Sequence, residues 1–229
     1  MKRALIEAAK TVGRPVKRTL ETLIDNRLAD YHMPPKMPGD ILLTFDDGPH
    51  PEYTERLLDL LDEYGARAVF FIIGQRAEKR PDLVKACLDR GHAIANHTYT
   101  HLDDGIGGRY SRPQVSDDIA KCSDLVQRVT GQATRLFRPP RGELNTKTVG
   151  AARDTGHRIV LWSIEGGEWG RRSDWSAADI AAYVAGGVRK RDILLLHDDN
   201  EKSLVVMASL LPRLRRENFD LVSAAASLR

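Results

Sequence analysis

The sequence is poor in cysteine and has no long apolar run. Only Cys87 and Cys122 occur among its 229 residues. Both fall in segments with helical periodicity, and their spacing matches no metal or redox motif, so we expect free thiols rather than a disulfide. No stretch approaches the roughly 18 apolar residues that a membrane-spanning helix needs. The composition therefore argues against a disulfide scaffold and against a helical membrane protein.

A recognisable secretion signal is also lacking. The chain begins with Met1-Lys2-Arg3, as a signal peptide can. However, Glu7 and Lys10 interrupt the apolar core of at least about seven residues that such a peptide requires. We therefore expect a cytoplasmic protein.

The N-terminal segment is basic and weakly amphipathic. Residues 1–30 contain seven lysines and arginines around scattered apolar residues. This pattern suits a helix that packs on the domain with a solvated basic face, and it also suits a helix lying on a membrane surface. Pro15 and the imperfect pattern favour the packed helix. We expect a helical extension over residues 1–39, with peripheral membrane contact as the alternative.

No charge of one sign dominates the chain. The sequence has 35 lysines and arginines against 32 aspartates and glutamates, interspersed rather than massed, for a net charge of +3. This balance predicts no nucleic-acid partner. Because 41% of the residues are apolar, the chain can form a domain with a substantial core.

From residue 40 onward, β-rich runs alternate with longer segments of helical periodicity. This alternation predicts parallel strands with crossover helices, in one domain over residues 40–229 that follows a proline-rich join at 34–39. We expect strands at 41–44, 68–73, 92–95, 136–138, 158–161, 192–196 and 219–222. We expect helices at 53–64, 81–90, 113–130, 146–155, 177–189 and 204–217.

Candidate polar residues stand just beyond the carboxyl ends of several expected strands. Seven strands with this arrangement predict an α/β fold of the TIM-like barrel type, in which that rim carries the active site. An open doubly wound sheet is the alternative. No dinucleotide-binding or phosphate-binding glycine motif follows a strand, which argues against a nucleotide site.

Two adjacent carboxylates, Asp46 and Asp47, follow the first expected strand. Like charges this close repel unless a cation or a basic partner offsets them. The pair His97 and His101, spaced i and i+4, can turn two imidazoles toward one point. Asp47, His97 and His101 would supply the three protein ligands of a catalytic zinc site, which keeps one position open for water. Asp46 would then be the unligated neighbour that accepts a proton.

Five motifs in this chain occur in the order typical of one enzyme family. They read T-F-D-D-G-P at 44–49, H-T-x-x-H at 97–101, R-P-P-x-G at 138–142, E-x-x-E-W at 165–169 and L-x-x-H at 194–197. The region from 40 to 222 therefore resembles the polysaccharide deacetylases, the NodB-homology or carbohydrate esterase 4 family. The resemblance implies a distorted (β/α) barrel, often seven-stranded, that uses a divalent metal, commonly zinc, to hydrolyse N-acetyl groups of amino sugars or, in some members, O-acetyl esters.

The resemblance also implies roles for individual residues. Asp46 resembles the general base, and Asp47, His97 and His101 resemble the metal ligands. His197 resembles the general acid that protonates the departing amine. Further roles fall to Arg138, which resembles the arginine that orients the base, and to Glu168, which resembles the acid that holds His197.

The remaining implied positions concern the substrate. Trp169 would line the groove, and Leu194 would shape the acetyl pocket. Arg141 stands where the family usually has an aromatic residue, which hints at an anionic or unusual substrate. Glu165 and Glu168 replace the usual aspartates and are each one methylene longer, so the geometry around His197 must differ from the family's.

We therefore expect a hydrolase of non-peptide carbon–nitrogen bonds, a polysaccharide deacetylase acting on an acetylated carbohydrate. Three alternatives remain open: an O-acetyl esterase, a deacylase or deformylase of a lipid-linked amino sugar, and a non-catalytic carbohydrate-binding barrel. The lipid-linked substrate would suit the basic N-terminal segment and Arg141. The non-catalytic barrel is disfavoured because a mere binder needs no acid, base and metal together.

Overall fold

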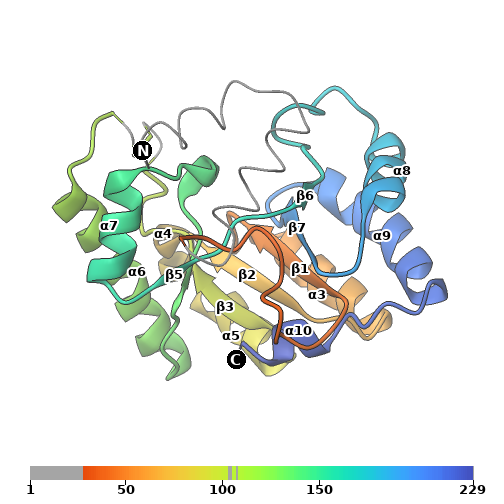
Figure 1. Cartoon of the computed structure of the whole chain (residues 1–229). Coiled ribbons are helices and arrows are strands. Elements are labelled where there is room, and N and C mark those ends of the chain that lie inside the picture. The colour runs from red at the N-terminus through yellow and green to blue at the C-terminus, as the bar shows by residue number, and fades with distance from the viewer. Residues whose placement is uncertain (1–27, 103–104, 107, 229) are drawn as a thin grey trace.

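The computed structural model describes residues 28–102, 105–106 and 108–228 and contains seven parallel strands surrounded by helices (Figure 1). The strands are β1 (Ile41–Asp46), β2 (Ala68–Ile72), β3 (Ala93–Asn96), β4 (Leu136–Phe137), β5 (Arg158–Ile159), β6 (Ile164–Glu165) and β7 (Asp192–His197). The α-helices are α3 (Tyr53–Glu63), α4 (Gly74–Lys79), α5 (Pro81–Asp89), α6 (Arg112–Thr130), α7 (Thr146–Asp154), α8 (Ala177–Gly187), α9 (Glu201–Arg216) and α10 (Ser223–Ala226). The expected helical extension falls largely on residues 1–27, which lie outside the described residues.

The strands form one curled sheet in the order β5-β4-β3-β2-β1-β7-β6. Its two edge strands, β5 and β6, follow one another directly in the chain. The extended segment between them crosses from one edge to the other, because Val160 N donates to Phe137 O at 2.9 Å and Ser163 N donates to Ile193 O at 3.1 Å. A single extended run thus closes the gap, and the expected distorted seven-stranded barrel is confirmed.

One expected strand is wrong. Segment 219–222 does not join the sheet, and the seventh strand is β6 instead. The segment makes isolated contacts with the starts of strands: Arg67 N donates to Leu221 O at 2.8 Å, and Asp40 N donates to Asp220 O at 3.3 Å. Its apolar Leu221 is buried in the outer core, so the β-like pattern reflects burial rather than strand pairing.

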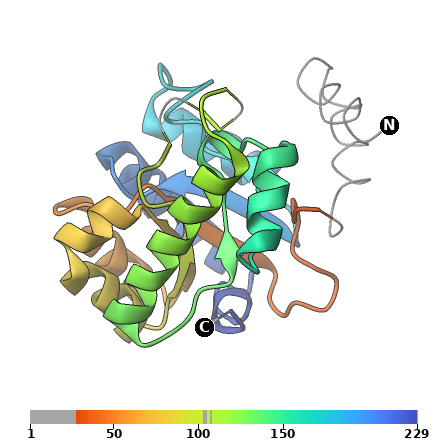
Figure 2. The ribbon, with the colours of Figure 1, turned by 90° about the vertical axis from the view of Figure 1, so that its left-hand side faces the viewer.

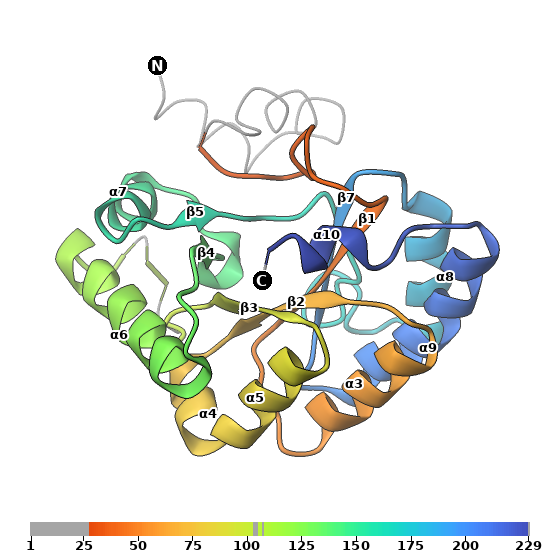
Figure 3. The same cartoon turned by 90° about the horizontal axis from the view of Figure 1, so that it is seen from below.

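The strands bury both faces, as parallel strands do. Residues such as Leu43, Phe45 and Leu196 belong to the core between the sheet and the helices. Residues of opposite parity, such as Leu42 and Ile193, belong to a second cluster inside the barrel. Figure 3 shows α3, α5, α6, α8 and α9 around the outside of the curved sheet, and Figure 2 shows α6 and α7 side by side.

The amino-terminal end of the barrel is closed from within the same chain. Ala224 and Ala225 of α10 pack in the interior cluster, and α10 lies across this end of the barrel (Figure 3). Met33, which is 2% exposed, joins them. Residues 28–37, which carry Met33 and are called the strap below, pair with the barrel through two isolated β-bridges, Asp30 with Val160 and His32 with Asp192. Residues 28–33 therefore contribute to the barrel, whereas the predicted domain boundary at residue 40 stays a prediction.

The two cysteines and helix α6 agree with the sequence expectations. Cys87 and Cys122 are both free and buried. Helix α6 begins at a capping box formed by Ser111 and Gln114 and ends before Gly131, whose φ of 73° is left-handed. Among the described residues, no helix combines the length and the apolar character needed to cross a membrane.

Candidate active site

The first two site residues lie where β1 ends. Asp46 is the last residue of β1 and shares its inward parity with Leu42 and Thr44, so its carboxyl group lies in the carboxyl-terminal mouth of the barrel, with 3% exposure. Asp47 follows with a φ of 71°, a left-handed conformation that is rare outside glycine. This backbone turn separates the two adjacent carboxylates and lets each serve a different purpose.

The loop after β3 carries the two histidines. Thr98 and His101 both have left-handed φ values, 68° and 66°, so the i, i+4 pair is placed by a loop rather than by a helix. Asp118 of α6 holds this loop, accepting hydrogen bonds from Tyr99 N at 2.8 Å and from Thr100 N at 3.0 Å. The sequence pattern pointed to the histidines but contained no signal for Asp118.

The structure brings Asp47, His97 and His101 together. One potential ligand atom from each lies within 4.8 Å of the others. Asp47 Oδ1 is 3.3 Å from Nε2 of His97 and 3.3 Å from Nε2 of His101. His97 Nδ1 lies 2.7 Å from the Arg138 carbonyl oxygen, which can only accept, so Nδ1 carries the proton and Nε2 is left for a ligand.

The charge state of the cluster suits a cation. Burial raises the pKa of Asp47, but the neighbouring imidazoles, His97 first and then His197 and His101, outweigh it and lower the pKa of Asp47. Asp47 Oδ1 is buried without a hydrogen-bond partner among the described residues. A buried carboxylate oxygen in this state is costly unless a positive charge approaches it. The donor set therefore fits a divalent ion.

Asp46 is paired with a buried arginine. Arg138 is 0% exposed and donates from Nη1 to Asp46 Oδ1 at 2.6 Å. The same Nη1 also donates to the Thr44 hydroxyl, while Nε and Nη2 donate to the carbonyl oxygens of Val160 and Leu161. A guanidinium held on all sides fixes the Asp46 carboxylate in one orientation, which is the role that the resemblance implied for Arg138.

His197 lies beside Asp46 on the neighbouring strand, as its register partner. Glu168 Oε1 is 2.9 Å from His197 Nδ1 and also accepts a hydrogen bond from Ser203 Oγ at 3.0 Å. Burial lowers the pKa of His197, but the hydrogen bond and charge of Glu168, helped by Asp46 and Asp47, raise it to about 9. The longer glutamate side chain therefore still reaches the histidine.

The substrate-facing predictions have mixed outcomes. Trp169 is 60% exposed, and its Nε1 donates to Asp199 Oδ1 at 2.9 Å. Arg141 is exposed and sits in a left-handed turn with a φ of 59°. Glu165 accepts a hydrogen bond from Trp162 Nε1 at 3.0 Å and does not contact His197 through any described hydrogen bond.

The prediction for Leu194 needs correction. Leu194 belongs to the core between the sheet and the outer helices, so its side chain faces away from the barrel interior. Side chains alternate along a strand, and Leu195 has the same parity as His197. Leu195 therefore faces the barrel interior, and strict counting of the alternation would have found it.

Several residues around the site had not been singled out. Asp198 is 1% exposed, and its Oδ2 accepts a hydrogen bond from Thr54 Oγ1 at 2.7 Å. Asp199 forms an ion pair with Arg76 at 3.0 Å. The acidic run directly after β7 was a usable signal for Asp198 and Asp199, because it follows a strand at the rim. Nothing in the sequence pattern pointed to Arg76.

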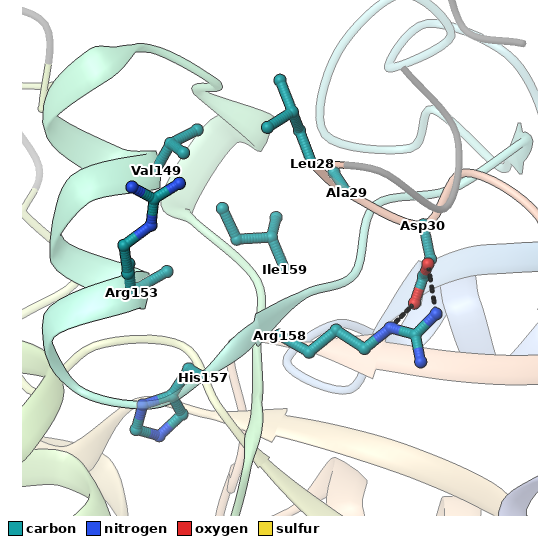
Figure 4. Close-up of a pocket in the computed structure, with 9 residues that line it drawn as sticks. Leu28, Ala29, Asp30, Val149, Arg153, His157, Arg158 and Ile159 are labelled. Atoms are coloured by element: carbon teal, nitrogen blue, oxygen red, sulfur yellow. Dashed lines mark hydrogen bonds and ion pairs between the residues drawn. The ribbon is translucent and has the colours of Figure 1, made fainter. Parts of the chain in front are cut away.

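A separate pocket of about 370 Å³ lies between α7, β5 and residues 28–30 (Figure 4). Asp30 and Arg158 form an ion pair along one side of it. Val149 and Ile159 contribute apolar surface. None of the predicted site residues lines this pocket, so it is not the mouth of the barrel.

Comparisons with known proteins agree with the geometry. The family model described as polysaccharide deacetylase matches residues 34–160. A peptidoglycan-N-acetylglucosamine deacetylase of Bacillus cereus is 36% identical over 196 residues, which cover 82% of this chain and 88% of that protein. A chitooligosaccharide deacetylase of Sinorhizobium fredii is 30% identical over 193 residues, which cover 78% of this chain and 87% of that protein.

Solved structures share the fold. The Bc1960 peptidoglycan N-acetylglucosamine deacetylase is 28% identical, with a TM-score of 0.76 over 84% of this chain and 89% of that chain. A pseudoenzyme of carbohydrate esterase family 4 from Bacillus anthracis is 21% identical, with a TM-score of 0.74 over 84% of this chain and 66% of that chain. Because a pseudoenzyme shares the architecture, the side chains of the site carry the functional argument and the fold does not.

Proposed function

This chain belongs to the polysaccharide deacetylase family, and we propose that it is a metal-dependent hydrolase that removes N-acetyl groups from amino-sugar polymers or oligomers. One observation carries the proposal: Asp47, His97 and His101 converge on one point while Asp46 stands beside them, held by Arg138. A carbohydrate-binding barrel without catalysis would have no use for this buried, charged arrangement.

Asp47, His97 and His101 would hold the ion. When bound, a divalent ion supplies a Lewis acid that polarises the acetyl carbonyl and makes a water molecule more acidic. Asp46 is the general base, because it is the carboxylate outside the ligand set, and Arg138 keeps it fixed. Zinc is the ion we propose, since two imidazoles and one carboxylate form a ligand set typical of catalytic zinc.

His197 is the general acid. An amine is a poor leaving group unless it is protonated, and the raised pKa of His197 keeps the imidazole protonated near neutral pH. Glu168 orients it through Nδ1, which leaves Nε2 to donate toward the departing nitrogen. Base and acid thus stand on adjacent strands, at register partners Asp46 and His197.

The test combines metal analysis with acetate release. We expect the purified protein to contain one zinc or similar ion per chain and to release acetate from chitooligosaccharides or peptidoglycan fragments. The variant His97→Ala should lose both, while the control His157→Ala, a histidine held by Ser123 and Thr155 away from the cluster, should keep both. A metal-free wild type with full activity would refute the proposal.

A second substrate class follows from Arg141. Its exposed guanidinium in the turn after β4 favours an anionic substrate, such as an amino sugar on a lipid diphosphate carrier, carrying an acetyl or formyl group. Including a lipid-linked amino sugar and acetylxylan in the substrate panel separates this class, and O-acetyl esters, from N-acetylated polymers.

The basic N-terminal segment also bears on the cellular location of the protein. We propose a cytoplasmic protein, with peripheral membrane contact through the basic residues of the first 39 positions as the alternative. Fractionation of the full chain with vesicles containing anionic lipid tests this, and a chain that stays in the supernatant at low salt would count against membrane contact.

A further inference from the structure

The exposed indole of Trp169 is held by two consecutive links between loops. Glu168, in the loop after β6, accepts a hydrogen bond from His197 at the end of β7. The next residue, Trp169, donates from Nε1 to Asp199 at 2.9 Å, two residues beyond His197. These two links tie residues 168 and 169 to the end of β7 and the residues that follow it, although 60% of the Trp169 surface remains exposed.

Asp199 is itself held by a third element. Its side chain is only 10% exposed, and its Oδ2 accepts a hydrogen bond from Arg76 Nη1 of α4 at 3.0 Å. The same Arg76 nitrogen is 2.5 Å from the carbonyl oxygen of Asp47. One guanidinium therefore connects the turn that carries the ligand Asp47 to the carboxylate that holds the indole.

An indole fixed at its nitrogen differs from an ordinary exposed tryptophan. A hydrogen bond to an ionised carboxylate is stronger than one between neutral groups. The hydrogen bond leaves both faces of the indole ring available to a ligand. Because it already restricts rotation of the side chain, less conformational entropy is lost when a ligand binds. A flat, preorganised aromatic face at the mouth of the barrel suits the apolar face of a pyranose ring.

We propose that Asp199, held by Arg76, is a positioning residue that presents Trp169 as a stacking surface for a sugar ring of the substrate. The inference rests on the proposed function, because it assumes that the substrate is a saccharide. It goes further by assigning recognition of the saccharide to a link between two loops and helix α4, in which Arg76 and Asp199 act through Trp169.

The kinetic test uses a tetramer of N-acetylglucosamine as the probe and the zinc-loaded full chain. Asp199→Ala should raise KM about tenfold, the equivalent of one hydrogen bond to a charged group, while kcat changes less than about twofold. Asp199→Asn keeps an oxygen that accepts from the indole and should raise KM less. A fall in kcat with an unchanged KM in Asp199→Ala would overturn the proposal, because it would place the effect on the Asp47 turn.

A double-mutant cycle tests whether Asp199 acts through the indole. Trp169→Phe keeps an aromatic ring but removes the nitrogen donor, so it should raise KM as Asp199→Ala does. The double variant should be no worse than either single variant. Additive losses would show that Asp199 and Trp169 act separately and would overturn the proposal.

Arg76 is tested in the same assay. Because its guanidinium also contacts the Asp47 carbonyl oxygen, Arg76→Ala should raise KM and lower kcat together. Wild-type KM in this variant would remove Arg76 from the proposal.

Fluorescence separates the inference from the proposed function. Titrating the wild type with the tetramer should change tryptophan emission, and the change should vanish in Trp169→Phe, in which Trp162 and Trp175 remain. No change in the wild type would overturn the inference. Acetate release is independent of this readout, so a protein that binds the tetramer through Trp169 but never releases acetate would refute the hydrolase and leave the stacking surface supported.

Discussion

At the scale of single residues, the site concentrates conformations and charges that folding alone would disfavour. Asp47, His101 and Arg141 adopt left-handed backbone conformations, each at a cost of about 1–3 kcal/mol for a non-glycine residue. Arg138 is fully buried. Costs of this kind persist at functional sites because the surrounding structure holds them in place.

The first prediction concerns the base. Asp46→Asn should retain the metal, because Asp47, His97 and His101 are unchanged, but should lower kcat by about 10²–10⁴-fold. It should also lower the free energy of unfolding by several kcal/mol, roughly the cost of leaving a buried charge such as Arg138 without its partner. Metal analysis, acetate release and urea unfolding measure the three effects. Activity within tenfold of wild type would assign the base elsewhere.

The second prediction concerns the acid. Glu168→Gln removes the charge that raises the pKa of His197 to about 9, so the pKa of His197 should fall. Since His197 must be protonated to act, kcat should decline at a lower pH in the variant than in the wild type. Profiles of kcat against pH, recorded with the same metal, measure the shift, and superimposable alkaline limbs would contradict the role of Glu168.

The same pair affects stability with a defined sign. The pKa of His197 in the folded protein lies above the unfolded value of about 6.5. The stabilising contribution is therefore fully present below pH 6.5 and is lost as the pH rises through about 9. Glu168→Gln should remove this part of the pH dependence of unfolding.

At the scale of elements, the ends of strands supply the chemistry and the helices hold the loops in position. Asp118 of α6 fixes the loop that carries His97 and His101. The first turn of α3 fixes the turn after β1 that contains Asp47. Thr54, in this first turn of α3, is fully buried. Its hydroxyl group accepts a hydrogen bond from His50 N at 2.7 Å and donates one to the Asp198 carboxyl group at 2.7 Å. The Asp198 carboxyl group lies directly under Gly48, where any β-carbon would be 2.2 Å from its oxygens.

The third prediction tests this connection. Thr54→Val conserves the shape of the side chain but leaves buried Asp198 and His50 N without the hydroxyl, which should cost about 1–3 kcal/mol of stability. It should also lower kcat, because the disturbed turn contains Asp47. The control Thr54→Ser keeps the hydroxyl and should retain kcat. Equal behaviour of the two variants in urea unfolding and acetate release would show that the hydroxyl does not matter.

At the scale of the whole molecule, the barrel is closed by segments distant in sequence. The run through β5 and β6 joins the two edges of the sheet, while α10 and the strap carrying Met33 cover the opposite end from the site. The catalytic rim is thus supported by a packed interior rather than by a hollow tube.

The fourth prediction compares two methionines of this strap. Met33→Ala should lower the free energy of unfolding by about 2–5 kcal/mol, because it empties a buried position beside Ala224 and Ala225. Met37 is only partly buried against the same cluster, so Met37→Ala should cost distinctly less. Urea unfolding of both variants provides the comparison, and equal losses would mean that the strap does not close the barrel.

The sequence predicted the elements whose signals are local. Long amphipathic helices and apolar strands such as β1 and β7 have a periodicity that any single window contains. The strand β6 has only two residues, so its identity depends on the partner it pairs with. For that reason segment 219–222 was mistaken for a strand, while β6 was missed.

The residues of the site show the same distinction between local signals and contacts made by distant partners. By itself the sequence indicated which groups the structure brings together, because chemistry, spacing and motif order single out Asp46, Asp47, His97, His101, Arg138, Glu168 and His197. Only the tertiary structure decided how they are held, with Asp118 bonded to the histidine loop and Asp199 bonded to the indole of Trp169. The physical reason is that a hydrogen bond between residues far apart in the chain depends on where the folded elements place its two atoms, and no local pattern encodes that distance.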